Sequence, residues 1–369
     1  MNRPIAMADP AAEYRSLREE LDAAVQRVLA SGRLILGPEG EALEGEIAAY
    51  VGAQHAVAVN SGTDALHLAL RAAGIGPGDD VLVPAFTFFA SAEAVSHAGA
   101  TPVFVDVDEK TFNADASHFE RSVTRRTRAV IAVHLFGQSA PVEDIAQWCR
   151  HRDLALIEDC AQAIGADWQG QRVGSFGRFA CFSFYPTKNL AAAGDGGLVT
   201  CGDAEDAKSL RMLRHHGSKT PYVHEVIGWN SRLDEVQSAM LRVKLGSLAR
   251  LNEKRRRTAR AYGEALAGVP ITVPHEHGHG AHVYHQYTIR TRSRERVREA
   301  LAREGIASAV FYATPLHRQP PYAQANADTR LPFCERLAQD VLSLPIHPYL
   351  DEDAVARIAA MVRVHAASK

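Results

Sequence analysis

The stretch CFSFYPTKNLAAAGDGGLVT, residues 181–200, places one lysine between an apolar strand pattern and a glycine-rich run. Lys188 follows a turn at Pro186, and a second strand pattern follows the glycines. A lysine among small and apolar residues is unusual, because an unpaired ammonium is costly to take out of water. Burial lowers the pKa of an amine, which suits a neutral nucleophile or a Schiff base. The alternative is an ordinary lysine at a loop tip, so this stretch alone only nominates Lys188.

Short apolar runs alternate with helical patterns on both sides of this stretch. The runs that predict strands are 56–59, 81–83, 102–107, 129–133, 154–158, 179–184 and 197–200. Helical patterns such as 64–73, 142–151 and 203–214 separate most of them. This alternation predicts an α/β fold with a large, mostly parallel, doubly wound sheet. We expect the chemistry at the carboxyl ends of its strands, where ligands bind in such sheets.

The rest of the chain predicts helices before the sheet and a second domain after it. Helical or strand patterns there lie at 14–29, 41–50, 248–266, 283–290, 294–304 and 353–366. A chain of 369 residues also exceeds one ordinary core. We therefore expect a large domain in residues 1–248, which includes an N-terminal helical segment, and a small C-terminal α+β domain in residues 249–369.

The composition is that of an ordinary globular protein. Apolar residues make up 46% of the chain, charged residues 23%, and the formal net charge is −2. This balance gives no electrostatic signal for nucleic acid or an anionic membrane, and no apolar run is long enough to span a bilayer. The five cysteines are scattered without a CxxC pair, which predicts buried free thiols in a reducing compartment. We therefore expect a cytoplasmic protein.

Five histidines crowd one segment of the expected second domain: His275, His277, His279, His282 and His285. Their spacing is loosely compatible with a metal site. No acidic residue or cysteine is spaced with them as a further ligand, so we expect a flexible loop and no metal site.

Polar and aromatic residues follow the ends of two early strands. After 56–59, Ser61-Gly62-Thr63 opens a helix whose free N–H groups form either an anion site or an ordinary N-cap. After 81–83, the aromatic residues of PAFTFFA, residues 84–90, form either a stacking face for a flat ring or plain core.

Two later strands end in titratable side chains. The strand 154–158 runs into Asp159, which either pairs with a cation such as a protonated pyridine nitrogen or supports the start of a helix. His134, after 129–133, is either catalytic or a hydrogen-bonded residue at the edge of the core. Together the strand ends offer an anion cradle, an aromatic plate, a carboxylate and a lysine. These match the phosphate, flat ring, ring nitrogen and aldehyde of pyridoxal phosphate.

Eight motifs then identify a family. They are NSGTDAL (60–66), PAFTFFAS (84–91), HLFGQ (134–138), EDCAQAIGA (158–166), FSFYPTKNL (182–190), GDGG (194–197), NSRLDEVQSA (230–239) and PLHRQPPY (315–322). In this order the chain resembles the DegT/StrS family of nucleotide-sugar aminotransferases. The resemblance implies the fold type I aminotransferase architecture, pyridoxal phosphate as cofactor, and a homodimer whose active site lies at the subunit interface.

The resemblance also implies roles for the residues around the cofactor ring. Lys188 matches the lysine that forms the Schiff base, and Asp159 matches the carboxylate on the pyridine nitrogen. Gln162 matches a side chain that contacts the ring, and Phe88 matches the aromatic residue stacked on it.

Further matches concern the phosphate and the substrates. Gly62 and Thr63 match the phosphate-binding turn, Ser183 a hydroxyl on the phosphate, and Asn230 an asparagine that reaches it from the partner subunit. Tyr312 and His317 either line the sugar pocket or are structural, and His134 is a third candidate for a substrate contact.

FYPTKNL with GDGG and HLFGQ resembles family members that act on 3-keto sugars, whereas GEGG is more frequent in those that act on 4-keto sugars. We therefore expect transfer of an amino group from glutamate to a keto group, at C3, of a nucleotide-linked deoxy sugar. The alternatives are a 4-keto-sugar or cyclitol aminotransferase, and a non-catalytic regulator that binds a sugar nucleotide.

Overall fold

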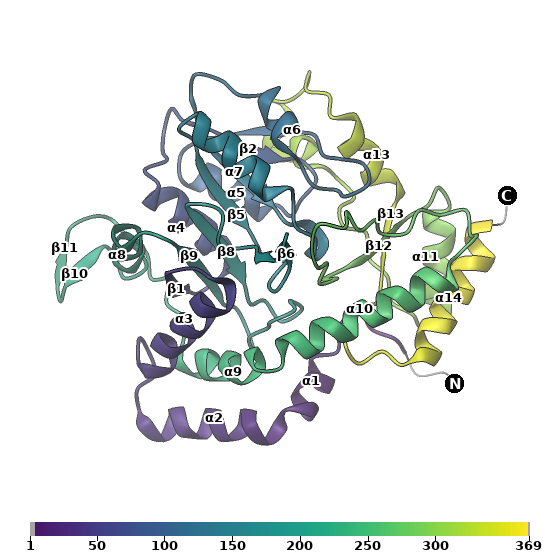
Figure 1. Ribbon diagram of the computed structural model, residues 1–369, viewed down its shortest axis with the longest axis horizontal. Coiled ribbons are helices and arrows are strands. Elements are labelled where there is room, and N and C mark those ends of the chain that lie inside the picture. The colour runs from purple at the N-terminus through teal and green to yellow at the C-terminus, as the bar shows by residue number, and fades with distance from the viewer. Residues whose placement is uncertain (1–3, 368–369) are drawn as a thin grey trace.

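The computed structural model describes residues 4–367 and contains the expected sheet (Figure 1). Its seven strands are β1 (His55–Val59), β2 (Asp80–Pro84), β3 (Thr101–Val105), β4 (Thr127–Val133), β5 (Ala155–Asp159), β8 (Phe179–Ser183) and β9 (Gly197–Cys201). They lie in the order β1-β9-β8-β5-β4-β2-β3. All neighbours are parallel except β9, which is antiparallel to both β1 and β8. The seven strands predicted for this sheet and the predicted fold class are confirmed, with every boundary of these seven strands within two residues.

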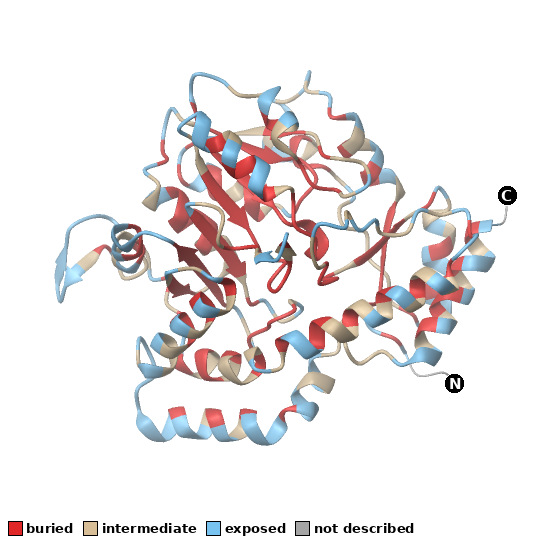
Figure 2. Cartoon of the chain, viewed as in Figure 1, coloured by how far each residue is buried: buried red, intermediate tan, exposed pale blue. Residues whose placement is uncertain are grey.

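Helices cover both faces of the sheet because its strands are apolar on both faces. In β1, Val57 and Val59 join one buried cluster, while Ala56 and Ala58 join another on the opposite face. The helices that contribute to the first cluster include α4 (Gly62–Ala72), α5 (Ala90–His97), α6 (Ala116–Glu120), α7 (Val142–His151) and α8 (Ala204–Leu213). Those that contribute to the second include α3 (Pro38–Val51) and α9 (Glu235–Leu245). Figure 2 shows the buried sheet between helices whose outer faces are exposed.

Before the sheet, the sequence predicted one helix over 14–29, and the structure has two. α1 (Pro10–Ser16) and α2 (Arg18–Ser31) are separated at Leu17, whose φ of −129° is not helical. Gly32 ends α2 at a φ of 66°, a left-handed conformation that glycine adopts without strain.

Several short elements connect these parts. They are η1 (Leu135–Gly137), the two-stranded pair β6 (Asp167–Trp168) and β7 (Gln171–Arg172), and the pair β10 (Ser218–Thr220) and β11 (Val223–His224). The β10–β11 hairpin projects away from the body of the molecule (Figure 1).

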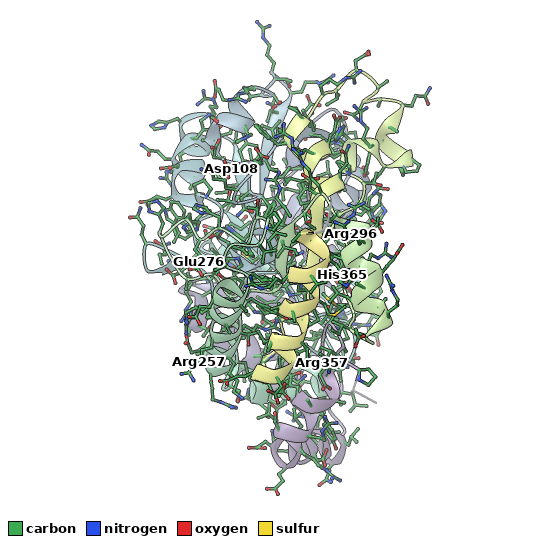
Figure 3. All side chains as sticks on the ribbon, turned by 90° about the vertical axis from the view of Figure 1, so that its right-hand side faces the viewer. Asp108, Arg257, Glu276, Arg296, Arg357 and His365 are labelled. Atoms are coloured by element: carbon green, nitrogen blue, oxygen red, sulfur yellow. The ribbon has the colours of Figure 1, made fainter. Side chains whose placement is uncertain are left out.

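The C-terminal part begins with α10 (Leu248–Ala265), the long charged helix. The C-terminal part also contains the antiparallel strands β12 (Tyr287–Arg290) and β13 (Val341–Leu344), and the helices α11 (Arg294–Arg303) and α14 (Glu352–Ala367). α14 packs against both α10 and α11 (Figure 3), and Arg296 of α11 donates to the carbonyl of His365 at 2.8 Å.

Two segments cross the expected boundary between the domains. Ile5 pairs with Ile306 and packs in the C-terminal cluster, although the expected division assigns it to the large domain. Conversely, the segment with η2 (Leu316–Arg318), α12 (Pro320–Ala323) and α13 (Pro332–Asp340) packs on the first cluster of the sheet. The Asp106 carboxylate, just after β3, accepts the N–H groups of Phe333 and Cys334 at the start of α13.

The five cysteines are free and buried, as predicted. Among residues 4–367, no helix combines the length and apolar character needed to cross a membrane.

Candidate active site

Lys188 and Asp159 meet at the carboxyl ends of two neighbouring parallel strands. Asp159 is the last residue of β5, and Lys188 follows the end of β8 after a short turn. Asp159 is buried, with 6% of its surface exposed. Burial lowers the pKa of the Lys188 amine to about 8, and the nearby Asp159 carboxylate opposes part of that shift. Near neutral pH a fraction of the amine is therefore already the uncharged nucleophile.

Two hydrogen bonds fix the carboxylate of Asp159. Ser91 Oγ donates to Oδ2 at 2.8 Å, and the N–H of Ala161 donates to Oδ1 at 3.1 Å. Because each oxygen has its own donor, the plane of the carboxylate is defined before any ligand binds.

The N-terminus of α4 lies against the end of β8. Ser61 caps the helix, and its Oγ accepts the N–H of Asp64 at 3.1 Å, so the ordinary N-cap is present. The next residues, Gly62 and Thr63, carry N–H groups for which the helix supplies no acceptor. A Cβ at Gly62 would lie 2.6 Å from the Cβ of Ser183, so glycine lets the helix end approach the Ser183 hydroxyl. N–H groups and hydroxyls thus gather in one anion cradle.

The glycine-rich run after Lys188 allows a second close approach, between β9 and the start of α4. A Cβ at Gly197, the first residue of β9, would lie 2.3 Å from the carbonyl oxygen of Ser61. The GDGG stretch noted in the sequence therefore brings β9 and the start of α4 into direct backbone contact.

Phe88, Gln162 and Tyr312 form one group, and Tyr312 lies near the Asp159 carboxylate. Phe88 is 56% exposed, and the centroid of its ring lies 6.3 Å from that of Tyr312. Gln162 Nε2 donates to Tyr312 Oη at 3.0 Å, and Gln162 Oε1 accepts the N–H of Phe136 at 2.7 Å. An exposed aromatic face next to a buried carboxylate is the setting that a flat, positively charged ring requires.

His134 lies apart from this group. It is fully buried; its Nδ1 accepts the N–H of Ala140 at 3.0 Å, so the ring proton is on Nε2, which lies 3.1 Å from Glu158 Oε2. Glu158 and Asp159 are consecutive in β5 and point to opposite faces of the sheet. The position of His134 therefore fits the structural alternative.

Glu158, His134 and Cys160 place three possible metal ligands within 4.8 Å of one another. The Glu158 oxygens, however, accept the N–H groups of Gly174, Phe176 and Gly177 at 2.8 Å each. Burial also raises the pKa of the Cys160 thiol well above its usual value, which keeps it protonated. This cluster is a hydrogen-bonded part of the core that holds the chain entering β8.

His317 and Asn230 also lie outside the group around Lys188. His317 is fully buried in η2, with Nε2 3.1 Å from Glu335 Oε1. Asn230 is exposed and pairs with His215 near the β10–β11 hairpin.

Sequence analysis missed a polar network behind Lys188. Asn189 Nδ2 donates to Asn252 Oδ1 at 2.8 Å and to the carbonyl of Val283 at 2.9 Å, and His285 Nδ1 lies 3.3 Å from Asn189 Oδ1. The network fixes the backbone that carries Lys188. A polar residue directly after the lysine was the only signal in the sequence.

The histidine-rich segment is spread over several environments. His282 stacks on Tyr284, with ring centroids 3.8 Å apart, and burial lowers the pKa of His282 to about 3. His277 and His279 pack against Trp168, each at a centroid distance of 4.9 Å. His285, as described, belongs to the network behind Lys188.

The residues present fit pyridoxal phosphate: an amine with a lowered pKa, a buried and oriented carboxylate, an exposed aromatic face and an anion cradle that a Cβ would fill. Comparison with known proteins supports the same cofactor. The model of the DegT/DnrJ/EryC1/StrS aminotransferase family matches residues 15–363.

Individual relatives match the chain from end to end. A UDP-N-acetyl-3-dehydro-alpha-D-glucosamine 3-aminotransferase from Acidithiobacillus ferrooxidans is 49% identical over 362 residues, 98% of each chain. A pleiotropic regulatory protein from Geobacillus stearothermophilus is 46% identical over 371 residues, 98% of this chain and 99% of that one. The crystal structure of S. venezuelae DesV in complex with a ketimine intermediate has a TM-score of 0.97 at 45% identity and covers 100% of both chains. The chain therefore belongs to the DegT/DnrJ/EryC1/StrS family of pyridoxal-phosphate-dependent sugar aminotransferases.

Proposed function

We propose that this aminotransferase moves an amino group from glutamate to the keto group at C3 of a nucleotide-linked deoxy sugar. The observation that carries the chemistry is the Lys188 amine, with its pKa lowered to about 8, beside the buried carboxylate of Asp159. Support for C3 as the carbon that receives the amino group comes from the relative that is 49% identical and is named a 3-aminotransferase.

Each residue near the amine has a distinct task in this proposal. Pyridoxal phosphate supplies an aldehyde that condenses with amines and a ring that accepts the electron pair released at the substrate carbon. Lys188 Nζ would hold the cofactor and, once released from it, would carry the proton to and from the reacting carbon. Asp159 would hold the proton on the ring nitrogen, Phe88 would cover one face of the ring, and Gln162 would contact the ring.

The phosphate would be held by Gly62 and Thr63 at the start of α4, by Ser183 of β8 and by Asn230 of the partner subunit. Tyr312 is the best placed of the three proposed substrate contacts, because it touches both Gln162 and Phe88. The buried positions of His134 and His317 argue for supporting roles.

A homodimer with a shared site is part of the proposal. In the single chain, apolar side chains of the β10–β11 region are exposed, among them Tyr222 at 97% and Ile227 at 89%. Leu34, Ile35 and Leu36, between α2 and α3, are exposed as well. Apolar side chains grouped on the surface mark an interaction site. The expected cytoplasmic location stays a prediction.

The reverse reaction provides a test, because amino sugars are stable starting materials. Purified protein receives 2-oxoglutarate with either a 3-amino or a 4-amino deoxy sugar linked to UDP or dTDP, and glutamate is measured by mass spectrometry. We expect glutamate from the 3-amino sugars only. Glutamate from the 4-amino sugars alone would establish the 4-keto alternative.

The regulator alternative requires a different measurement. Borohydride reduction of the cofactor-loaded protein should abolish its visible absorbance and add mass to the peptide that contains Lys188. The Lys188→Ala variant is the control and should gain no mass. A wild-type protein that stays colourless with pyridoxal phosphate and gains no mass would overturn the aminotransferase proposal and favour a binding role.

A further inference from the structure

One of the two donors that fix Asp159 comes from the start of α5, directly after the aromatic segment. Ser91 lies in the first turn of α5, and its Oγ is 2.8 Å from Asp159 Oδ2 although the residues are 68 positions apart. Ser91 is fully buried and Asp159 is nearly so. A hydrogen bond between such groups, shielded from water, is stronger than one at the surface.

Thr87 extends this contact into a chain of hydroxyl groups. Its Oγ1 lies 3.4 Å from Ser91 Oγ, and only 2% of its surface is exposed. An ionised carboxylate only accepts, so the single hydroxyl proton of Ser91 points to Asp159. Ser91 then accepts from Thr87, and both hydroxyl dipoles are oriented toward the carboxylate.

The same segment also carries the stacking residue. Phe88 follows Thr87 directly, and the N–H of Ser91 donates to the carbonyl of Phe88 at 3.3 Å. One turn of chain therefore carries both the aromatic side chain that would face the cofactor ring, Phe88, and the hydroxyl groups that orient the Asp159 carboxylate.

We propose that Ser91, assisted by Thr87, is a positioning residue that holds the Asp159 carboxylate in the orientation in which it would meet the ring nitrogen of the cofactor. The inference rests on the proposed roles of Lys188 and Asp159. When the Ser91 hydroxyl is removed, the Ala161 N–H is the only donor left to the carboxylate among the residues that the structure describes. The carboxylate can then rotate, and it holds the proton on the ring nitrogen less firmly.

The test measures that proton directly. Wild-type protein and Ser91→Ala are loaded with pyridoxal phosphate labelled with ¹⁵N in the ring, and the ¹⁵N shift is followed from pH 6 to 10. We expect the ring nitrogen of Ser91→Ala to lose its proton about one pH unit lower than in wild type, and cofactor binding to weaken about tenfold, the size expected for a lost hydrogen bond to a charged group. Thr87→Val should lower the pH at which the ring nitrogen loses its proton and weaken cofactor binding as well, but by smaller amounts than Ser91→Ala.

Two further variants separate positioning from packing. Ser91→Thr retains the hydroxyl and should move both values back toward wild type. Ser91→Cys fills the space with a weak donor and should behave as Ser91→Ala does, and it carries the test if the alanine variant does not fold. Ser96→Ala, on the exposed side of the same helix, should match wild type; Ser96 bonds instead to the Ala92 carbonyl and Tyr322.

The outcomes distinguish this inference from the function on which it rests. In one outcome, wild type attaches the cofactor to Lys188, but Ser91→Ala and Ser91→Cys match it within about twofold in the proton affinity of the ring nitrogen and in cofactor affinity. A twofold change is worth only a few tenths of a kcal/mol. In that case the positioning role is wrong and the aminotransferase proposal stands. If wild type attaches no cofactor, the proposed function itself fails.

Discussion

At the scale of single residues, Lys188 should set the pH dependence of cofactor attachment. Its pKa is lowered by burial to about 8, so the amine is charged below that pH and neutral above it. The neutral amine is the nucleophile. The rate at which cofactor-free protein attaches pyridoxal phosphate should therefore rise about tenfold per pH unit below pH 8 and level off above it. Stopped-flow absorbance measures this rate.

Asp159→Asn tests how the Asp159 carboxylate changes the pKa of Lys188. The carboxylate raises the pKa of Lys188 against the effect of burial, so its removal should move the levelling point to a lower pH. Lys110, which is exposed, gives a control in Lys110→Ala, whose profile should match wild type. A wild-type rate that keeps rising to pH 10 would contradict a desolvated Lys188.

At the scale of elements, the spacing between α4 and β8 should depend on the absence of a side chain at Gly62. In Gly62→Ala, the new Cβ would lie 2.6 Å from Ser183 Cβ and 3.2 Å from Ser183 Cα, so the helix end must move away from the strand. We expect overpacking to cost about 1–3 kcal/mol of unfolding free energy. We also expect pyridoxal phosphate to bind at least about tenfold more weakly. Denaturant unfolding and cofactor titration measure the two effects.

Gly45 supplies the matched control in another helix. It is exposed within α3, and a Cβ there would meet no atom of residues 4–367 within 4 Å. Gly45→Ala should therefore leave cofactor binding unchanged and stabilise the protein by about 0.5–1 kcal/mol. Equal cofactor affinity in Gly62→Ala and wild type would show that the start of α4 is not the phosphate site.

At the scale of the whole molecule, a shared site predicts complementation between two inactive variants. Lys188→Ala lacks the amine, and Asn230→Ala lacks the side chain proposed to reach the partner's cofactor phosphate. In a heterodimer of the two, one site carries both defects and the other is intact. Heterodimers isolated with two affinity tags should therefore show about half the wild-type activity per dimer.

Both homodimers serve as controls and should have little activity. Sedimentation of wild type should give a dimer at micromolar concentration, and Ile227→Asp, at a residue that is 89% exposed in the single chain, should weaken it. Heterodimers as inactive as their parents would place Asn230 in the same site as the Lys188 of its own chain.

Particular residues show how far sequence reasoning reached. The amine of Lys188, the carboxylate of Asp159 and the turn at Gly62 could each be nominated because they follow apolar runs that predict strands, and strand ends share one edge of a parallel sheet. The hydroxyl of Ser91 could not, although PAFTFFAS was recognised as a motif. Its contact with Asp159 depends on the order of β2 and β5 in the sheet, which no local pattern encodes.

Arg255 shows the opposite case, in which a local pattern suggests the wrong environment. The charged run of α10 is typical of a solvated face, and Arg256 does pair with Glu253 there. Arg255 instead is buried and donates to the carbonyls of Tyr284 and Ile346. Whether a charged helix position meets solvent depends on what packs on it.

The sequence by itself determined the strands, the α/β class and the chain order of the groups proposed to act on the cofactor, because apolar periodicity and strand–turn–helix chemistry are local properties. Only the tertiary structure decided that Asp159 faces Lys188 while Glu158 faces His134, that β9 is inserted antiparallel, and that His134 and His317 are buried. The physical reason is that successive strand residues point to opposite faces, and register, strand order and burial are fixed only when distant segments pack together.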